Sequence, residues 1–265
     1  MTTTPNAGGW PRSRLLLLVA TVAVTAVALV AGLGLAVWFA FAPTPTVASG
    51  PAPVTDAAVR GEVYRDYLAA EPMLQVAAGA ASTPSVAAEL GPTMTLPAAT
   101  SVGAVGVASG FPQTPEGAVA QLAAVEVTVV EAMSIPVAHQ VHAAWSLPGG
   151  VTASEWAMTR NVQSFLTNAG GLGNTKDDSV FVSASPAAGQ IKGVDGPDWV
   201  LACVLLDVQA TIVTDARIGY GHCERMQWTD GRWMIAPGTP PAPAPSVWPG
   251  SELALQAGWR TLTDG

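Results

Sequence analysis

The chain has 265 residues, a net charge of −8 at pH 7 and only 11% charged residues. This acidic balance argues against binding to nucleic acid or to anionic head groups, both of which need basic patches, and we expect no direct nucleic-acid partner. Once the apolar and proline-rich segments are set aside, enough chain remains for one modest domain.

The first predicted element is a membrane-spanning helix over residues 15–41. This run is uncharged and mostly apolar, and it follows Arg12 and Arg14. A helix of this length rises about 40 Å, which exceeds the roughly 30 Å hydrocarbon core of a bilayer. The two arginines place residues 1–14 in the cytoplasm and the rest of the chain outside, by the positive-inside rule. We therefore predict a single-pass protein of the cell membrane that contacts lipid through residues 15–41.

Two questions about this segment stay open. The sequence Ala40-Phe41-Ala42 has the spacing of a signal-peptidase site, although the apolar run is longer than the roughly 7–15 residues of a secretory signal. Small residues also recur every fourth position, which lets transmembrane helices approach closely, or they reflect only an alanine-rich chain. This helix-association row consists of Ala28, Gly32, Ala36 and Ala40.

Residues 42–110 form a predicted stalk and wrapping segment. Prolines are dense in residues 43–55 and favour an extended, semi-rigid spacer. A short helix is expected over Glu62–Leu74. Residues 75–110 contain little that would build a core, so we expect a loop or a partly ordered wrapping segment there.

Residues 111–236 form the predicted compact domain, which begins with three helices. Thr114-Pro115-Glu116 has the pattern of an N-cap, a first-turn proline and an acidic residue, and the helix continues to Met133. A second helix is expected over residues 137–145. A third begins at the capping-box pair Thr152 and Glu155 and ends at Gly170-Gly171.

Strands follow the helices. We expect them over residues 179–184, 198–213, 217–229 and 232–236, with Asp230-Gly231 as a two-residue hairpin turn. Three helices followed by a mostly antiparallel sheet predict an α+β domain. Residues 237–265 then form a proline-rich spacer and a C-terminal tail.

The chain has two cysteines, Cys203 and Cys223, on successive predicted strands. An oxidising compartment favours a structural disulfide between them, and two buried thiols are the alternative. Such a crosslink would stabilise the fold by about 3 kcal/mol in the chain-entropy model.

Two motifs carry a resemblance to a known group of proteins. They are the segment Gly110-Phe-Pro-Gln-Thr-Pro-Glu-Gly-Ala-Val-Ala120 and the hairpin Trp228-Thr-Asp-Gly-Arg-Trp233. Together with the predicted anchor and stalk, they resemble membrane-anchored proteins of actinobacterial conjugative elements in the VirB8/TcpC-type group. The resemblance implies an NTF2-like extracytoplasmic domain, with three helices packed on a curved sheet.

The function that this resemblance implies is that of a scaffold. It would be a non-enzymatic component of a conjugation or type IV secretion-like apparatus that forms homo-oligomers and contacts other transfer proteins. Alternatives are a membrane-tethered NTF2-like ligand-binding protein or enzyme, and a Mce-associated accessory protein of envelope transport.

No catalytic or metal-binding motif stands out, and we expect no cofactor and no metal. Asp207, inside an apolar strand, is the one carboxylate with the potential to lie in a cleft; otherwise it points outward or pairs with Arg217 or Arg225. His139 and His142 lie one turn apart, but a zinc site needs further ligands. The predicted strands also contain Trp199, Trp228 and Trp233. In a small domain such residues belong to the core more often than they line a pocket.

Overall fold

The computed structural model describes residues 60–168, 173–211 and 215–265. The chain divides into two units, Met1–Asp56 and Ala57–Gly265, and only the second is described below. The predicted membrane helix and its helix-association row therefore lie outside the described residues. Within the described ranges, no helix has both the length and the apolar character needed to cross a bilayer.

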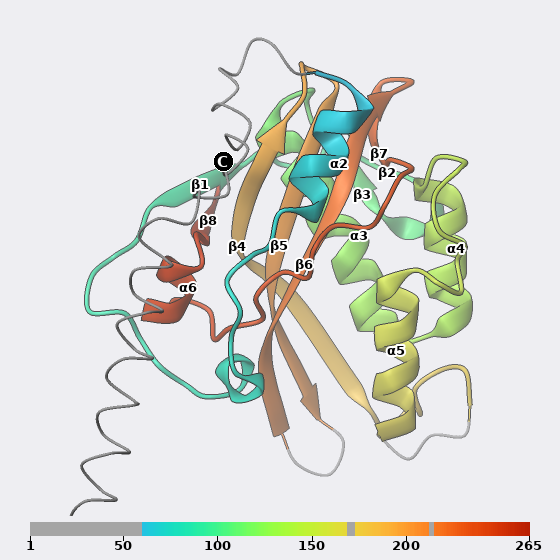
Figure 1. Cartoon of the computed structure of the whole chain (residues 1–265). Helices are drawn as coiled ribbons and strands as arrows, with labels where there is room; N and C mark the ends of the chain where they lie inside the picture. Colours follow the sequence, from blue (N-terminus) through green and yellow to red (C-terminus); the bar gives the residue numbers. More distant parts are fainter. Residues whose placement is uncertain (1–59, 169–172, 212–214) are drawn as a thin grey trace, which may run out of the picture. The chain divides into compact units, whose positions relative to one another are not determined.

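A curled six-stranded sheet organises the second unit (Figure 1). The strand order is β1-β8-β4-β5-β6-β7; β1 and β8 are parallel, and all other neighbours are antiparallel. This arrangement confirms the predicted α+β class. The strands are β1 Thr93–Leu96, β4 Phe181–Val194, β5 Trp199–Thr211, β6 Asp215–Thr229, β7 Arg232–Ile235 and β8 Arg260–Asp264, and a separate small sheet pairs β2 Ser101–Val102 with β3 Ala108–Ser109.

Three helices cover one side of the sheet, which we call the helical face (Figure 1). They are α3 Pro115–Ala132, α4 Ile135–Trp145 and α5 Ala157–Asn168. Thr114 caps α3 by accepting a hydrogen bond from the Gly117 amide at 3.0 Å, as its sequence pattern predicts.

The start of α4 differs from the prediction. Ser134, expected only to break the preceding helix, caps α4, so that Ile135 and Pro136 form its first turn. Proline is tolerated there because the first amides of a helix have no intrahelical partner.

The central strand β5 is buried on both sides. Val200, Val204 and Leu206 pack against the helices, while Leu201 and Leu205 point to the opposite face. Successive side chains of a strand alternate between faces, so a strand covered on both sides is apolar throughout. This explains why the sequence of β5 shows no polar alternation.

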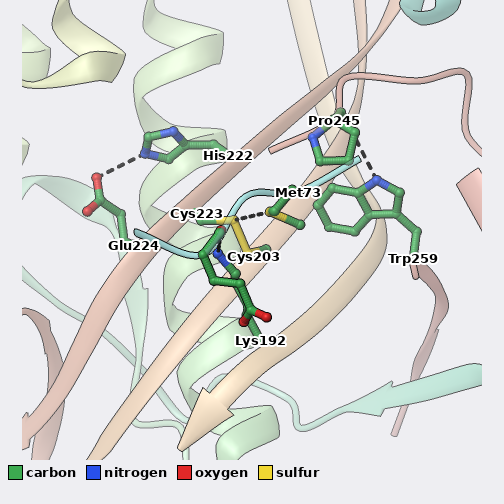
Figure 2. Close-up of a disulfide and its surroundings, with 9 residues drawn as sticks. Met73, Lys192, Cys203, His222, Cys223, Glu224, Pro245 and Trp259 are labelled. Atoms are coloured by element: carbon green, nitrogen blue, oxygen red, sulfur yellow. Dashed lines mark hydrogen bonds and ion pairs between the residues drawn. A yellow bond between two sulfur atoms is a disulfide. The ribbon is translucent and has the colours of Figure 1, made fainter. Parts of the chain in front are cut away.

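The opposite face is covered by short helices and irregular chain. The helices are α2 Glu62–Ala70 and α6 Glu252–Gln256, together with the 3-10 turn Ala78–Ala81. A second 3-10 turn, Ala104–Gly106, lies instead next to α4. Cys203 and Cys223 face each other on β5 and β6 and form the predicted disulfide, with Met73 and Trp259 around it (Figure 2). The compact unit therefore draws on chain both before and after residues 111–236.

Strands β1, β4 and β8 differ from the prediction. β4 covers 14 residues, whereas the sequence predicts a strand only over residues 179–184. Its register shifts near Pro186 and again between Ile191 and Gly193, so its side chains do not follow one simple alternation. The parallel pair of β1 and β8 joins segments expected to be a loop and a tail.

Candidate functional site

A cavity of about 430 Å³ lies between α4, α5, β6 and the proline-rich segment 238–246. Strand β7 pairs only with the last residues of β6, Met226–Thr229, so the cavity runs along a part of β6 that has no strand neighbour on that side. Its size suits a small ligand. The polar and charged residues of its lining are His142, Ser146, Glu155, Arg160, Asn161, Tyr220, His222, Glu224, Arg225 and Ser246.

Glu224 is the buried carboxylate of the cavity wall. It projects from β6 toward the helices, and only 7% of the residue is exposed. Its Oε1 accepts hydrogen bonds from the Trp156 indole at 2.7 Å and from His222 Nε2 at 2.9 Å, the latter drawn in Figure 2. Its Oε2 accepts no hydrogen bond from any residue in the described ranges. One carboxylate oxygen is therefore fixed, and the other remains available.

Glu126 is a second acid beside the first. It lies on α3, is fully buried, and neither of its carboxyl oxygens has a partner among the described residues. Burial raises the pKa of Glu126 well above its usual value, and the charge of Glu224 raises it further. Both effects favour the neutral form of the side chain.

Aromatic rings line the wall between these acids and solvent. The ring of Tyr220 stacks on His222 with centroids 6.1 Å apart, and the Tyr220 hydroxyl accepts a hydrogen bond from Asn161 at 2.7 Å. Burial, reinforced by Glu126, raises the pKa of Tyr220. The His142 ring lies 5.3 Å from that of Trp156.

His142 contributes no positive charge to this wall at neutral pH. Burial lowers the pKa of His142, while the charge of Glu224 acts in the opposite direction. Because the ordinary value is already 6.5, the imidazole is neutral near pH 7.

The proline-rich segment closes the cavity because β6 carries two glycines. A Cβ atom at Gly219 or Gly221 would overlap the carbonyl oxygen of Val247 or Pro245. The Gly221 amide donates to Ser246 Oγ at 3.0 Å, and the Pro245 carbonyl accepts from the Trp259 indole at 3.2 Å (Figure 2). The segment expected to be a spacer is thus held on the sheet.

Two charged residues at the cavity are already paired. Arg225 donates to Asp66 Oδ1 at 2.6 Å, with its guanidinium 5.7 Å from the Trp199 ring on the opposite face. Glu155 accepts from the Thr152 hydroxyl at 2.8 Å. The two residues bond to each other as their pattern predicts, but α5 begins only at Ala157, so this pair does not cap the helix. Arg160 lies on the exposed side of α5 at the rim.

The structure places Asp207 away from this cavity. It lies on the opposite face, near the end of β5, and both carboxylate oxygens accept hydrogen bonds from Arg217, at 2.7 and 2.5 Å. The Arg217 guanidinium in turn lies 4.7 Å from the Trp248 ring. Of the two placements considered from sequence, the structure has the cross-strand ion pair.

The other residues singled out from sequence also have definite places. His142 lines the cavity and His139 does not, and the described residues contain no group of three or more His, Cys, Asp or Glu side chains arranged to hold a metal ion. Trp199 and Trp233 are core residues, and Trp228 packs edge-on against Trp233 at 5.4 Å.

Sequence reasoning missed both glutamates. A signal for Glu126 existed, since it is a charged residue on the inner side of an otherwise Ala/Val-rich helix. No comparable signal marked Glu224, because it stands in a polar part of β6 and only the position of α5 shows that it faces inward. Comparison with known proteins gives no further assignment: no family model, no curated protein and no solved structure matches this chain.

Proposed function

We propose that this chain is a single-pass membrane scaffold whose NTF2-like domain works outside the cytoplasm, as a non-enzymatic component of a conjugation or type IV secretion-like apparatus. Residues 15–41 would hold it in the cell membrane. The domain would act through contacts with other transfer proteins and with further copies of itself.

The observation that carries the proposal is the disulfide. Cys203 and Cys223 account for every cysteine in the chain, and both lie in the buried layer on the opposite face. Disulfides persist in oxidising compartments and are rare in the cytosol. The bond therefore favours the topology that the charges before residue 15 predict.

The surface of α2 supports a role in protein contacts. Val63 is 79% exposed and Tyr67 is 65% exposed. Residues four apart on a helix are neighbours, so the two form a small apolar surface on the solvent side of α2. Apolar side chains gathered on a surface are typical of protein interaction sites, whereas isolated ones are common.

Site-specific crosslinking tests this role. A photo-crosslinking amino acid at position 67 in the full chain, activated in living cells, should give adducts with transfer-apparatus proteins or a second copy of the chain. The matched control places it at Ser179, which is also exposed but precedes β4. Adducts only with envelope lipid-transport proteins, or none at position 67 beyond those at position 179, would refute the transfer scaffold.

Topology is tested separately. A membrane-impermeant maleimide should label a cysteine introduced at Glu89, an exposed position, in intact cells. Native Cys203 and Cys223 should stay unlabelled until the protein is denatured and reduced. Labelling of position 89 only after lysis would place the domain in the cytosol and contradict the proposal.

A further inference from the structure

The cavity beside β6 contains an acceptor that the protein itself does not use. Glu224 Oε1 is occupied by Trp156 and His222, while Oε2 accepts from no described residue although Glu224 belongs to the cavity wall. Carboxylates bind strongly to charged donors, and such hydrogen bonds are about twice as strong as neutral ones.

The rings around this oxygen are arranged as the walls of a pocket. Trp156 is 2% exposed, and Tyr220 and His142 complete the aromatic part of the lining. The negatively charged faces of aromatic rings attract cations that have been removed from water. A carboxylate surrounded by aromatic rings is the combination that recognises ammonium groups.

We propose that this cavity binds a small organic cation, a protonated amine or guanidinium, whose N–H groups donate to Glu224 Oε2 and whose charge lies against the rings of Trp156 and Tyr220. The site goes beyond the scaffold role, and it lies on the helical face, away from the apolar surface of α2.

The charges of the cavity favour a cation over an anion. Glu224 would repel an anion, and Arg225 is engaged by Asp66 on the opposite face of the sheet. Arg160, at the rim on the exposed side of α5, would attract one, while the His222 ring is already engaged with Glu224 Oε1. His142 is neutral near pH 7, so it does not offset the charge of Glu224.

The buried acid strengthens this choice. Glu126 is fully buried and has no partner among the described residues, so a positive charge held near Glu224 would also favour its ionised form. An anionic ligand would instead favour the neutral form of Glu126 and would gain no electrostatic attraction from that residue. The two glutamates thus act in the same direction on a bound cation.

Ligand titration of the full chain in detergent micelles tests the proposal. The probes are agmatine and hexylamine, with hexanoate and hexanol as the anionic and neutral counterparts of hexylamine. We expect the amines to raise the unfolding temperature and to give saturable heats, whereas hexanoate and hexanol do neither. Equal effects of hexylamine and hexanol would show an apolar pocket and overturn the inference.

A pair of variants ties the effect to Glu224. Glu224→Gln removes the charge but keeps the acceptor for Trp156 and His222, and it should weaken amine binding at least tenfold. The control Glu89→Gln removes a charge from an exposed residue outside the cavity and should bind like the wild type. Unchanged affinity in Glu224→Gln would refute the site.

NMR signals of the histidine rings test the site in the wild-type protein, so this test does not depend on whether Glu224→Gln folds. The chain contains three histidines, of which His142 and His222 line the cavity and His139 does not. In NMR spectra of wild-type protein labelled at histidine, hexylamine should shift two of the three ring signals. These shifts should saturate at the same hexylamine concentration as the binding heats. No shift, or a shift of the third signal alone, would overturn the inference.

Discussion

The two faces of the sheet are covered in different ways. On the helical face, three helices, of which Thr114 and Ser134 cap the first two, pack on a continuous apolar layer that includes Leu122, Val204 and Trp233. On the opposite face, α6 and irregular segments from both ends of the unit meet over the disulfide and Trp259, and α2 packs on Trp199 and Leu201. A helical layer satisfies its own backbone groups, whereas an irregular layer needs side chains and crosslinks to hold it.

Buried tryptophans anchor irregular chain on both faces of the sheet. Buried indole N–H groups donate to backbone carbonyls of irregular segments: Trp259 to Pro245, Trp145 to Ala104 and Trp233 to Pro112. Each ring therefore supplies apolar contact area and also fixes a piece of chain that lacks regular hydrogen bonds. The following changes test how strongly each face depends on such anchors.

The largest effect is expected from Trp259→Ala. The ring is 1% exposed and holds the proline-rich segment, so its removal should cost about 3–5 kcal/mol of unfolding free energy. Urea titration of the full chain measures this cost. The control Trp248→Ala removes a half-buried tryptophan of the same layer and should cost less. Equal costs would show that Trp259 is not an anchor.

Removing the disulfide should have the next largest effect. The variant carrying both Cys203→Ala and Cys223→Ala releases a crosslink between residues 20 apart and should lose about 3 kcal/mol. Differential scanning calorimetry at matched protein concentration checks this value. A loss well below about 1 kcal/mol would mean that the opposite face holds together without its crosslink.

On the helical face, one substitution should stabilise the fold. Glu126→Met keeps a similar volume and removes a buried polar group without a partner, so we expect a gain of about 1–3 kcal/mol. Chemical denaturation near neutral pH measures it. A loss of stability would show that Glu126 makes a favourable contact in solution.

The same residue predicts a pH dependence. Because the pKa of Glu126 is raised in the folded state, the folded protein holds a proton that the unfolded chain releases above about pH 4.5. The contribution of Glu126 is fully present below that pH and is lost as pH rises through the folded pKa. Comparing wild type with Glu126→Met across this range should show a growing gain for the variant. A constant difference would contradict the raised pKa.

The smallest effect is expected for Asp207→Asn. Its partner Arg217 has 47% of its side chain exposed, and exposed ion pairs contribute about 1 kcal/mol or less. The variant should also bind amines like the wild type, since Asp207 does not line the cavity. Loss of amine binding would place the ligand at Asp207 and not at Glu224.

Local signals predicted several elements correctly. The cap at Thr114 starts α3, and Asp230-Gly231, both with positive φ, turns β6 into β7 and sets Trp228 opposite Trp233. These features depend on neighbouring residues, whose backbone preferences can be read directly. The disulfide was also foreseeable, because two cysteines permit only one pairing.

The candidate site was not foreseeable in the same way. Asp207 interrupts an apolar strand, which made it a candidate for a residue in a cleft. The register of β5 places it instead on the opposite face, beside Arg217. Shifting a strand by one residue moves each of its side chains to the other face of the sheet. Because both faces of β5 are apolar, its sequence does not show which of its residues face the helices. The cavity further depends on the return of residues 238–246 across Gly219 and Gly221.

The sequence alone determined the α+β class, the cap of α3, the hairpin turn and the cysteine pair, since each follows from short-range periodicity or from a count. Only the tertiary structure decided that β8 joins β1, that β4 extends through two register shifts, and that Glu224 lines a cavity and raises the pKa of buried Glu126. Those outcomes depend on contacts between segments far apart in the chain, which no local pattern encodes.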